Sequence, residues 1–138
     1  MNNQIKLIEV RKFYFMHDGS LTGHPGLIVW KNEPKNLYLA IKFGTSPNKH
    51  NFAFKKPLGN NTIKSFVYKR AFLGKRGDFR KAPLEDMVIS NGELLELIRI
   101  VNFDNPVYSK NINRKDKRFY KWVLKKEKPF YQGQLSEH

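Results

Sequence analysis

A short polar segment in the first half of the chain collects side chains suited to chemistry on a phosphate group. Residues 37–51 read LYLAIKFGTSPNKHN, an apolar run followed by a polar one. Hydroxyl groups donate hydrogen bonds to phosphate oxygens, an ammonium group neutralises developing negative charge, and an imidazole exchanges a proton near neutral pH. The same letters also suit an ordinary turn. As a catalytic loop at the end of a rigid strand, the segment contributes Thr45, Ser46, Lys49 and His50.

A second histidine belongs to this loop if the flanking apolar runs pair as a hairpin. Residues 26–30 (GLIVW) and 37–43 (LYLAIKF) are separated by a short turn-like connection, which is typical of a hairpin. The turn before residue 26 and the loop after residue 43 then lie at the same end, so we expect His24 near Thr45. There His24 can serve as a general acid or base, whereas its other interpretation is a structural residue preceding a proline.

Paired basic residues and two phenylalanines alternate in residues 69–81, KRAFLGKRGDFRK. This spacing suits a single-stranded nucleic acid, with phosphates on the cations and bases stacked on an exposed ring. In the alternative interpretation both rings are in the core and the cations face solvent. We place Phe72 in the core and leave Phe79 open to either role. The predicted RNA-binding residues are Lys42, Lys69, Arg70, Lys75, Arg76, Phe79 and Arg80.

The net charge indicates a polyanionic partner. The 138 residues include 26 Lys plus Arg against 12 Asp plus Glu, a formal charge of +14. Such an excess attracts nucleic acid or an acidic membrane surface, although it also serves solubility alone. No segment combines a long apolar face with basic flanks, so we expect no membrane partner.

Cysteine is absent, which excludes disulfides and cysteine-based zinc sites. The four histidines show no metal-ligand spacing, so neither a metal nor another cofactor is expected. The amino-terminal residues lack an apolar run of signal-peptide length, and no segment is long enough to span a bilayer. We therefore expect a cytoplasmic protein.

The pattern of elements predicts an α+β fold in a single domain, residues 1–138. Ser90 or Asn91 can cap the one clear helical pattern, in which Leu94, Leu97, Ile98 and Val101 repeat at helical spacing. Residues 110–138 form a basic C-terminal extension that periodicity leaves open between helix and strand. Residues 74–87 are expected to be a basic loop. Strands are expected at residues 6–16, 26–30, 37–43 and 65–73, with a weaker one at 51–56.

Residues 22–103 resemble the core of the MazF/PemK-like toxin superfamily, and most closely its type III branch, the ToxN- and TenpN-like toxins. In that family a basic residue and a proline precede an apolar strand, and a second strand ends in a Thr or Ser loop. His24, Pro25 and the following apolar strands occupy these places here. The segment SFVYKRAFLGKRGDF, followed by a Leu-rich helix, is also similar to that branch.

The resemblance implies a small, partly open, strongly bent antiparallel β-barrel with one or two peripheral helices. It also implies a metal-independent endoribonuclease that cuts single-stranded RNA by attack of the 2′-hydroxyl, leaving a 2′,3′-cyclic phosphate and a 5′-hydroxyl. Carried over by position, Thr45 and Ser46 hold the scissile phosphate and Lys49 stabilises charge. His24 stands where many members have arginine, so both His24 and His50 are candidates for the acid or base.

The partners implied by the resemblance are the RNA substrate and an antitoxin. A +14 surface suits folded RNA, so a structured repeat RNA is preferred to a protein antitoxin. A homo-oligomer and a closed ring of toxin and RNA are both compatible with the family. The alternative function is a non-catalytic nucleic-acid-binding barrel, and a structural interaction module is a third.

Overall fold

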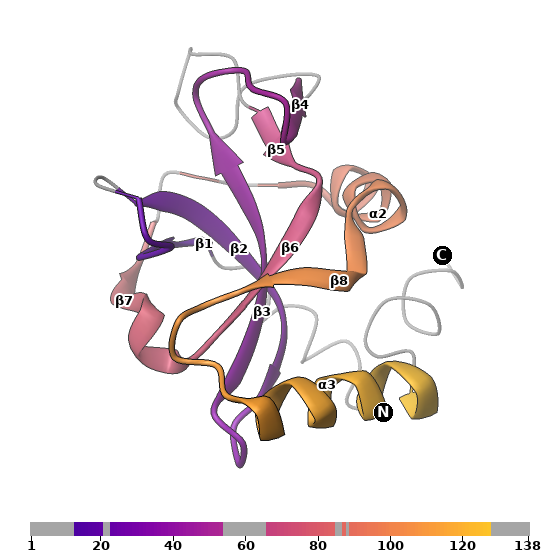
Figure 1. Ribbon diagram of the computed structural model, residues 1–138. Helices are drawn as coiled ribbons and strands as arrows, with labels where there is room; N and C mark the ends of the chain where they lie inside the picture. Colours follow the sequence, from indigo (N-terminus) through magenta and orange to yellow (C-terminus); the bar gives the residue numbers. More distant parts are fainter. Residues whose placement is uncertain (1–12, 21–22, 54–65, 85–86, 88, 128–138) are drawn as a thin grey trace.

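A central strand, β3 (Leu37–Gly44), organises the sheet. It pairs along one side with β2 (His24–Asn32) and along the other with β5 (Phe66–Tyr68) and β6 (Arg70–Gly74). The remaining strands are β1 (Phe13–Met16), β4 (Asn51–Ala53), β7 (Phe79–Pro83) and β8 (Asn102–Tyr108). The computed structural model of this chain describes residues 13–20, 23–53, 66–84, 87 and 89–127 (Figure 1).

The strands follow the order β4-β5-β3-β2-β1-β7, with β6 between β3 and β8. Every pair is antiparallel except β6 and β8, which are parallel. Within the described ranges, β4, β7 and β8 each have a single neighbouring strand, and the sheet does not close on itself. The expected α+β class, with a large and mainly antiparallel sheet and two helices, is confirmed.

Alternation along β3 divides the interior into two apolar clusters. Leu37, Leu39, Ile41 and Phe43 point into the larger cluster, because successive side chains of a strand face opposite sides. The even-numbered Tyr38 and Ala40 point into a smaller cluster with Met16, Ile28, Phe72 and Phe79. Residues 37–41 are all buried, as expected for a strand covered on both faces.

Helix α2 (Asn91–Ile100) covers the larger cluster, as its pattern predicted. Its N-cap Ser90 accepts a hydrogen bond from the Glu93 amide, and the Glu93 side chain accepts one from the Ser90 amide, at 3.1 and 3.0 Å. These reciprocal bonds satisfy backbone donors that a helix start leaves unpaired. The apolar stripe of Leu94, Leu97 and Ile98 is buried.

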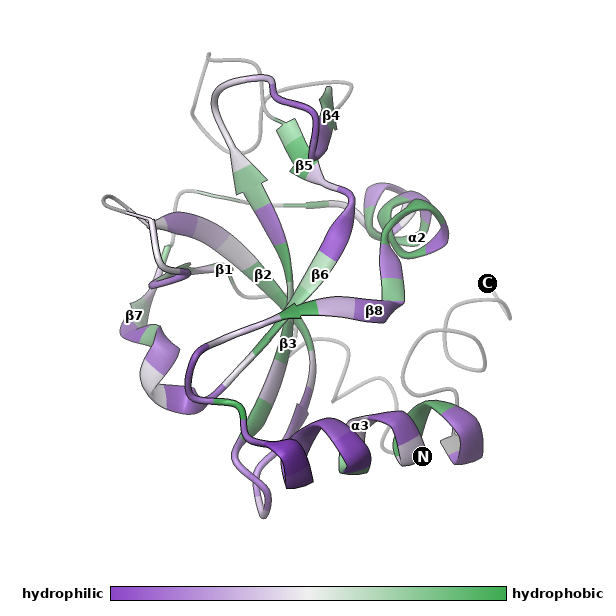
Figure 2. Ribbon diagram, in the orientation of Figure 1, coloured by the Kyte–Doolittle hydropathy of each residue, from purple (hydrophilic) through white to green (hydrophobic). Residues whose placement is uncertain are grey.

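Helix α3 (Arg114–Glu127) decides for a helix in this part of the extension, and residues 128–138 lie outside the described residues. Tyr120, Val123 and Leu124 are buried, and the Tyr120 hydroxyl donates to the Phe103 carbonyl at 2.7 Å. Figure 2 shows hydrophilic residues along most of the outer surface of this helix. Neither helix in the described part of the chain is long and apolar enough to cross a membrane.

Three expectations about the strands need correction. The strand expected at 65–73 is interrupted at Lys69, where the partner register shifts from Phe43↔Val67 to Ala40↔Phe72. The segment expected to be a loop contains a 3₁₀ helix, η1 (Arg76–Asp78), and the edge strand β7. No strand was predicted from the sequence where β8 lies. Residues 6–12 and 54–56 of two expected strands lie outside the described residues.

Candidate active site

One face of the sheet changes from apolar to polar at one end. Ile28 on β2 and Ala40 on β3 belong to the smaller cluster. On the same face, Lys42 follows Ala40 by two residues on β3, and His24 precedes Ile28 by four residues on β2. The register Gly26↔Lys42 places these side chains close together. The hairpin of β2 and β3, predicted from the sequence, is therefore what joins them.

Asp18, in the turn between β1 and β2, holds this polar group together. Its Oδ2 lies 2.8 Å from His24 Nδ1 and 2.5 Å from Lys42 Nζ, and its Oδ1 accepts a hydrogen bond from Ser20 Oγ at 2.7 Å. The Asp18 side chain is only 2% exposed. Burial alone raises the pKa of this carboxyl, but the hydrogen bonds from Lys42 and Ser20 and the lysine charge outweigh it and hold the pKa well below its usual range. Asp18 is thus a carboxylate at neutral pH.

The His24 ring is oriented by this carboxylate. Since an ionised carboxylate only accepts hydrogen bonds, Nδ1 of His24 is assigned the proton and donates it to Asp18 Oδ2. In the neutral ring Nε2 carries the lone pair, and no hydrogen bond to it is found among the described residues. The side chain is 22% exposed. An oriented, partly exposed imidazole of this kind can act as a general base.

Tyr68, at the end of β5, completes the group. Its ring packs edge-on against the His24 ring, with the centroids 5.5 Å apart, and Lys42 Nζ lies 4.2 Å from the Tyr68 centroid. Its hydroxyl accepts a hydrogen bond from Asn48 Nδ2 at 3.2 Å. A Cβ added at Gly44 would lie 3.2 Å from Tyr68 and 3.6 Å from His24, so the glycine lets both rings approach the start of the loop.

The predicted catalytic loop leaves the sheet beside this group. Two asparagines shape it: buried Asn51 accepts from the Asn48 amide and donates to the Ser46 carbonyl, both at 3.0 Å, while Asn48 accepts from the His50 amide at 2.8 Å. Residues 45–50 are all exposed. Among the described residues, no hydrogen bond or ion pair occupies the side chains of Thr45, Ser46, Lys49 and His50.

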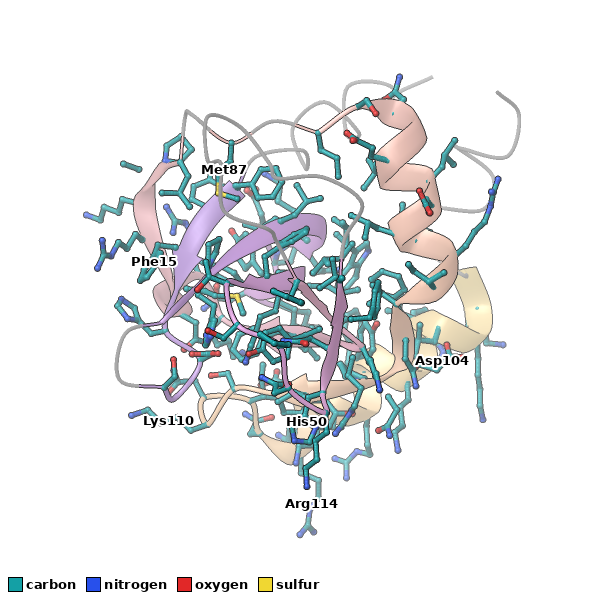
Figure 3. All side chains as sticks on the ribbon, turned by 90° about the horizontal axis from the view of Figure 1, so that it is seen from above. Phe15, His50, Met87, Asp104, Lys110 and Arg114 are labelled. Carbon is teal, nitrogen blue, oxygen red and sulfur yellow. The ribbon has the colours of Figure 1, made fainter. Side chains whose placement is uncertain are left out.

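The two histidines proposed as acid or base differ in their surroundings. His24 contacts Asp18 and Tyr68 and lies next to Gly44, the residue before Thr45. His50 is exposed on the loop after β3 (Figure 3). Of the two, His24 is therefore the histidine that a carboxylate orients.

The predicted RNA-binding residues do not form one patch. Lys42 belongs to the group just described, and Lys69 lies beside the loop, where its Nζ donates to the Lys49 carbonyl at 3.2 Å. Arg70 instead holds β8, donating to the carbonyls of Asn105 and Pro106 at 2.7 and 3.0 Å.

The other cations of that segment lie elsewhere. Lys75 forms an ion pair with the buried Asp116 at 3.1 Å, and the amide of Arg76 donates to Asn36 Oδ1 in the β2–β3 turn at 2.9 Å. This turn and Gly44 lie at opposite ends of β3, about 25 Å apart at the usual rise per residue. Arg80, on β7, lies over the Phe15 ring at 4.5 Å.

Phe79 is a core residue, which corrects its predicted role. It is 4% exposed and packs against Tyr38 and Phe72 at centroid distances of 6.0 and 6.3 Å. A ring so enclosed cannot stack on a base. The pairing of β7 with β1, through Met16↔Phe79, turns this ring inward.

Two members of the polar group, Asp18 and Tyr68, were absent from the predicted site. Asp18 lies in a turn sequence, HDGS, where a polar residue is ordinary. Tyr68 lies far from His24 in sequence, and the two meet only because β5 pairs with the end of β3. Alternation in residues 66–72 would have put Tyr68 on the face of Arg70, but the break at Lys69 separates the two, so the sequence held no usable signal for Tyr68.

Comparison of the chain with protein-family models, curated proteins and solved structures found no match. Within the described ranges, no three His, Asp or Glu side chains gather as ligands for a metal ion. The function must therefore be argued from the arrangement of the side chains.

Proposed function

We propose that this chain is a metal-independent endoribonuclease of the MazF/PemK-like superfamily, closest to the type III toxins, that cleaves single-stranded RNA. The observation that carries the proposal is the hydrogen-bonded His24–Asp18 pair, which lies with Lys42 and Tyr68 at the base of the exposed hydroxyl loop. In this proposal the twisted open sheet is the partly open barrel of that superfamily.

The proposed reaction begins with proton transfer to His24. Nε2 takes the proton of the 2′-hydroxyl as the 2′-oxygen forms a bond to the adjacent phosphorus. Asp18 keeps Nδ1 protonated and stabilises the imidazolium that results, so the base has the correct tautomer and a fixed orientation.

The phosphate is held from two sides. Thr45 and Ser46 donate to its non-bridging oxygens, and the ammonium groups of Lys49 and Lys42 stabilise the added negative charge. The bond from phosphorus to the 5′-oxygen then breaks, giving the cyclic phosphate, and the 5′-oxygen takes a proton. Tyr68 is the proposed donor because its hydroxyl lies at the same group, 3.2 Å from Asn48 Nδ2. His50 is the alternative donor.

The proposed biological context is a toxin–antitoxin pair in the cytoplasm, with a structured repeat RNA as the antitoxin. The +14 net charge supports a polyanionic inhibitor over a protein one.

The direct test is incubation of the purified protein with end-labelled single-stranded RNA in EDTA. We expect products with 2′,3′-cyclic phosphate and 5′-hydroxyl ends. His24→Ala should slow cleavage by about 100- to 10,000-fold, the usual contribution of a general base. His17→Ala is the matched control, because His17 is an exposed histidine whose backbone amide, bonded to the Asp78 carbonyl, is retained.

Two results would count against the proposal. Intact RNA with tight, salt-sensitive binding would support the non-catalytic nucleic-acid-binding domain instead. Equal loss of cleavage in His17→Ala and His24→Ala would remove His24 from its role.

A further inference from the structure

The exposed side of α3 carries a concentration of positive charge that the proposed cleavage does not use. Seven of the fourteen residues of the helix are Lys or Arg and two are acidic. One of the two, Asp116, is buried and paired with Lys75, and it also accepts a hydrogen bond from the Asn113 amide at 3.0 Å. The exposed cations of the helix are Arg114, Lys115, Lys117, Arg118, Lys121, Lys125 and Lys126.

An aromatic pair lies among these cations. Trp122 is 49% exposed, and its ring stacks on that of Phe119 with the centroids 5.9 Å apart and an interplanar angle of 24°. Lys35, from the β2–β3 turn, lies 5.2 Å from the Phe119 centroid. Cations around an exposed, flat ring are the combination by which proteins hold single-stranded nucleic acid, with phosphates on the cations and a base on the ring.

The other face of α3 limits the choice of partner. Tyr120, Val123 and Leu124 are buried in the protein. A helix that binds a membrane surface inserts its apolar face into the lipid, and this face is already covered. Predominantly positive charge with an exposed indole therefore fits a nucleic acid better than a lipid surface.

Helix α3 and the cleavage group lie at different ends of β3. Lys35 ties α3 to the β2–β3 turn, and Lys75 ties it to the start of η1. Figure 1 shows α3 in the lower part of the view, near the β2–β3 turn, and the β3–β4 loop at the top. Lys75 and Arg76, predicted to bind RNA but remote from His24, are thus neighbours of this helix.

We infer that the exposed face of α3, with Trp122 stacked on Phe119 as its platform, is a second binding surface for single-stranded RNA. Resting on the proposed function, this inference makes α3 the surface that holds a part of the RNA flanking the cleaved bond. Residues 118, 125 and 126 lie three or four positions from Trp122, so their cations share its side of the helix.

The test is the affinity of the full chain for a labelled 12-nucleotide oligouridine. We measure it by fluorescence anisotropy in variants that also carry His24→Ala, which prevents cutting. Trp122→Ala should weaken binding by about 5- to 50-fold, and Trp122→Phe should restore most of it. Ile100→Ala is the matched control, because Ile100 is also 49% exposed but lies on α2.

A second variant tests the same surface with Trp122 left in place, so its result does not depend on whether Trp122→Ala disturbs the fold. Arg118→Ser combined with Lys125→Ser should lower the slope of log K against log salt concentration by about 1.4, since each phosphate contact to a single strand contributes about 0.7. Affinity and salt slope unchanged in both variants would overturn the inference. If Trp122→Ala weakens binding of the same oligouridine annealed to its complement as much as binding of the single strand, the stacking role of Trp122 is overturned.

The two proposals can fail separately. If wild-type protein leaves RNA intact but binding depends on Trp122, the nuclease proposal fails and the α3 surface stands. If RNA is cut at a His24-dependent rate while Trp122→Ala leaves binding unchanged, the α3 surface fails and the nuclease proposal stands. Cleavage of a dinucleotide, which is too short to reach from the loop after Gly44 to the β2–β3 turn beside α3, about 25 Å at the usual rise per residue, should not respond to Trp122→Ala.

Discussion

Asp18 is the residue on which the candidate site most depends. One carboxylate holds the His24 ring, the Lys42 ammonium and the Ser20 hydroxyl, and these groups come from the β1–β2 turn and two strands. Its negative charge is what allows a lysine and a histidine to lie close together beneath a proposed phosphate site. Removing that charge should affect both stability and catalysis.

The effect on stability has a definite pH dependence. Because the folded protein holds the Asp18 pKa below its ordinary value, the ionised form favours folding. This contribution is fully present above the unfolded pKa of about 4 and is lost as the pH falls below it. Asp18→Asn should therefore lower the free energy of unfolding at neutral pH and flatten its decline in acid, measured by urea unfolding.

The control for this experiment is Asp104→Asn, an exposed carboxylate on β8. Its curve should follow the wild type across the pH range. If the free energy of unfolding falls in parallel for the wild type and Asp18→Asn between neutral and acidic pH, the Asp18 carboxylate is not the source of this pH dependence.

At the scale of elements, the strand break at Lys69 matters most. It separates β5 from β6, so that Tyr68 lies with His24 and Lys42, while Arg70 turns to β8. The adjacent cations Lys69 and Arg70 therefore make contacts in different parts of the fold. Lys69 faces the loop, and Arg70 ties the parallel strand β8 to the sheet.

This division predicts a contrast between two adjacent substitutions. Arg70→Met removes two hydrogen bonds to the carbonyls of β8 and should lower the free energy of unfolding by about 1–3 kcal/mol. Lys69→Met should change stability less and RNA affinity more. Thermal unfolding and anisotropy measure the two quantities, and a larger loss of RNA affinity in Arg70→Met than in Lys69→Met would reverse the assignment.

Elements with a local signal were predictable from the sequence, and those fixed by distant partners were not. Helix α2 has a capping box and an apolar stripe, and the β2–β3 hairpin has two apolar runs around a short turn. Strands β7 and β8, FRKAP and NFDNPVY, lack alternation and form only by pairing with β1 and β6. The same reason hid Tyr68 from the predicted site, while His24 and Lys42 were found.

At the scale of the whole molecule, the charge is distributed over two ends. The candidate catalytic group and loop lie at one end of β3, and the basic helix α3 lies near the other. In the proposed function, the net charge of +14 draws RNA to the surface in general, whereas the hydroxyl loop is needed only for cutting. Binding and toxicity should therefore be separable by substitution.

Expression in a bacterial host tests this separation. Wild-type protein should arrest growth, because cleavage of cellular RNA stops protein synthesis, while Thr45→Ala and Lys49→Ala should be tolerated. Both side chains are exposed and without partners among the described residues, so the variants should fold and keep most of their RNA affinity. Arg99→Ala, an exposed cation on α2, controls for the loss of one charge and should remain toxic. Growth arrest by all four proteins would show that the loop does not carry the activity, and growth with all four would remove the toxin assignment.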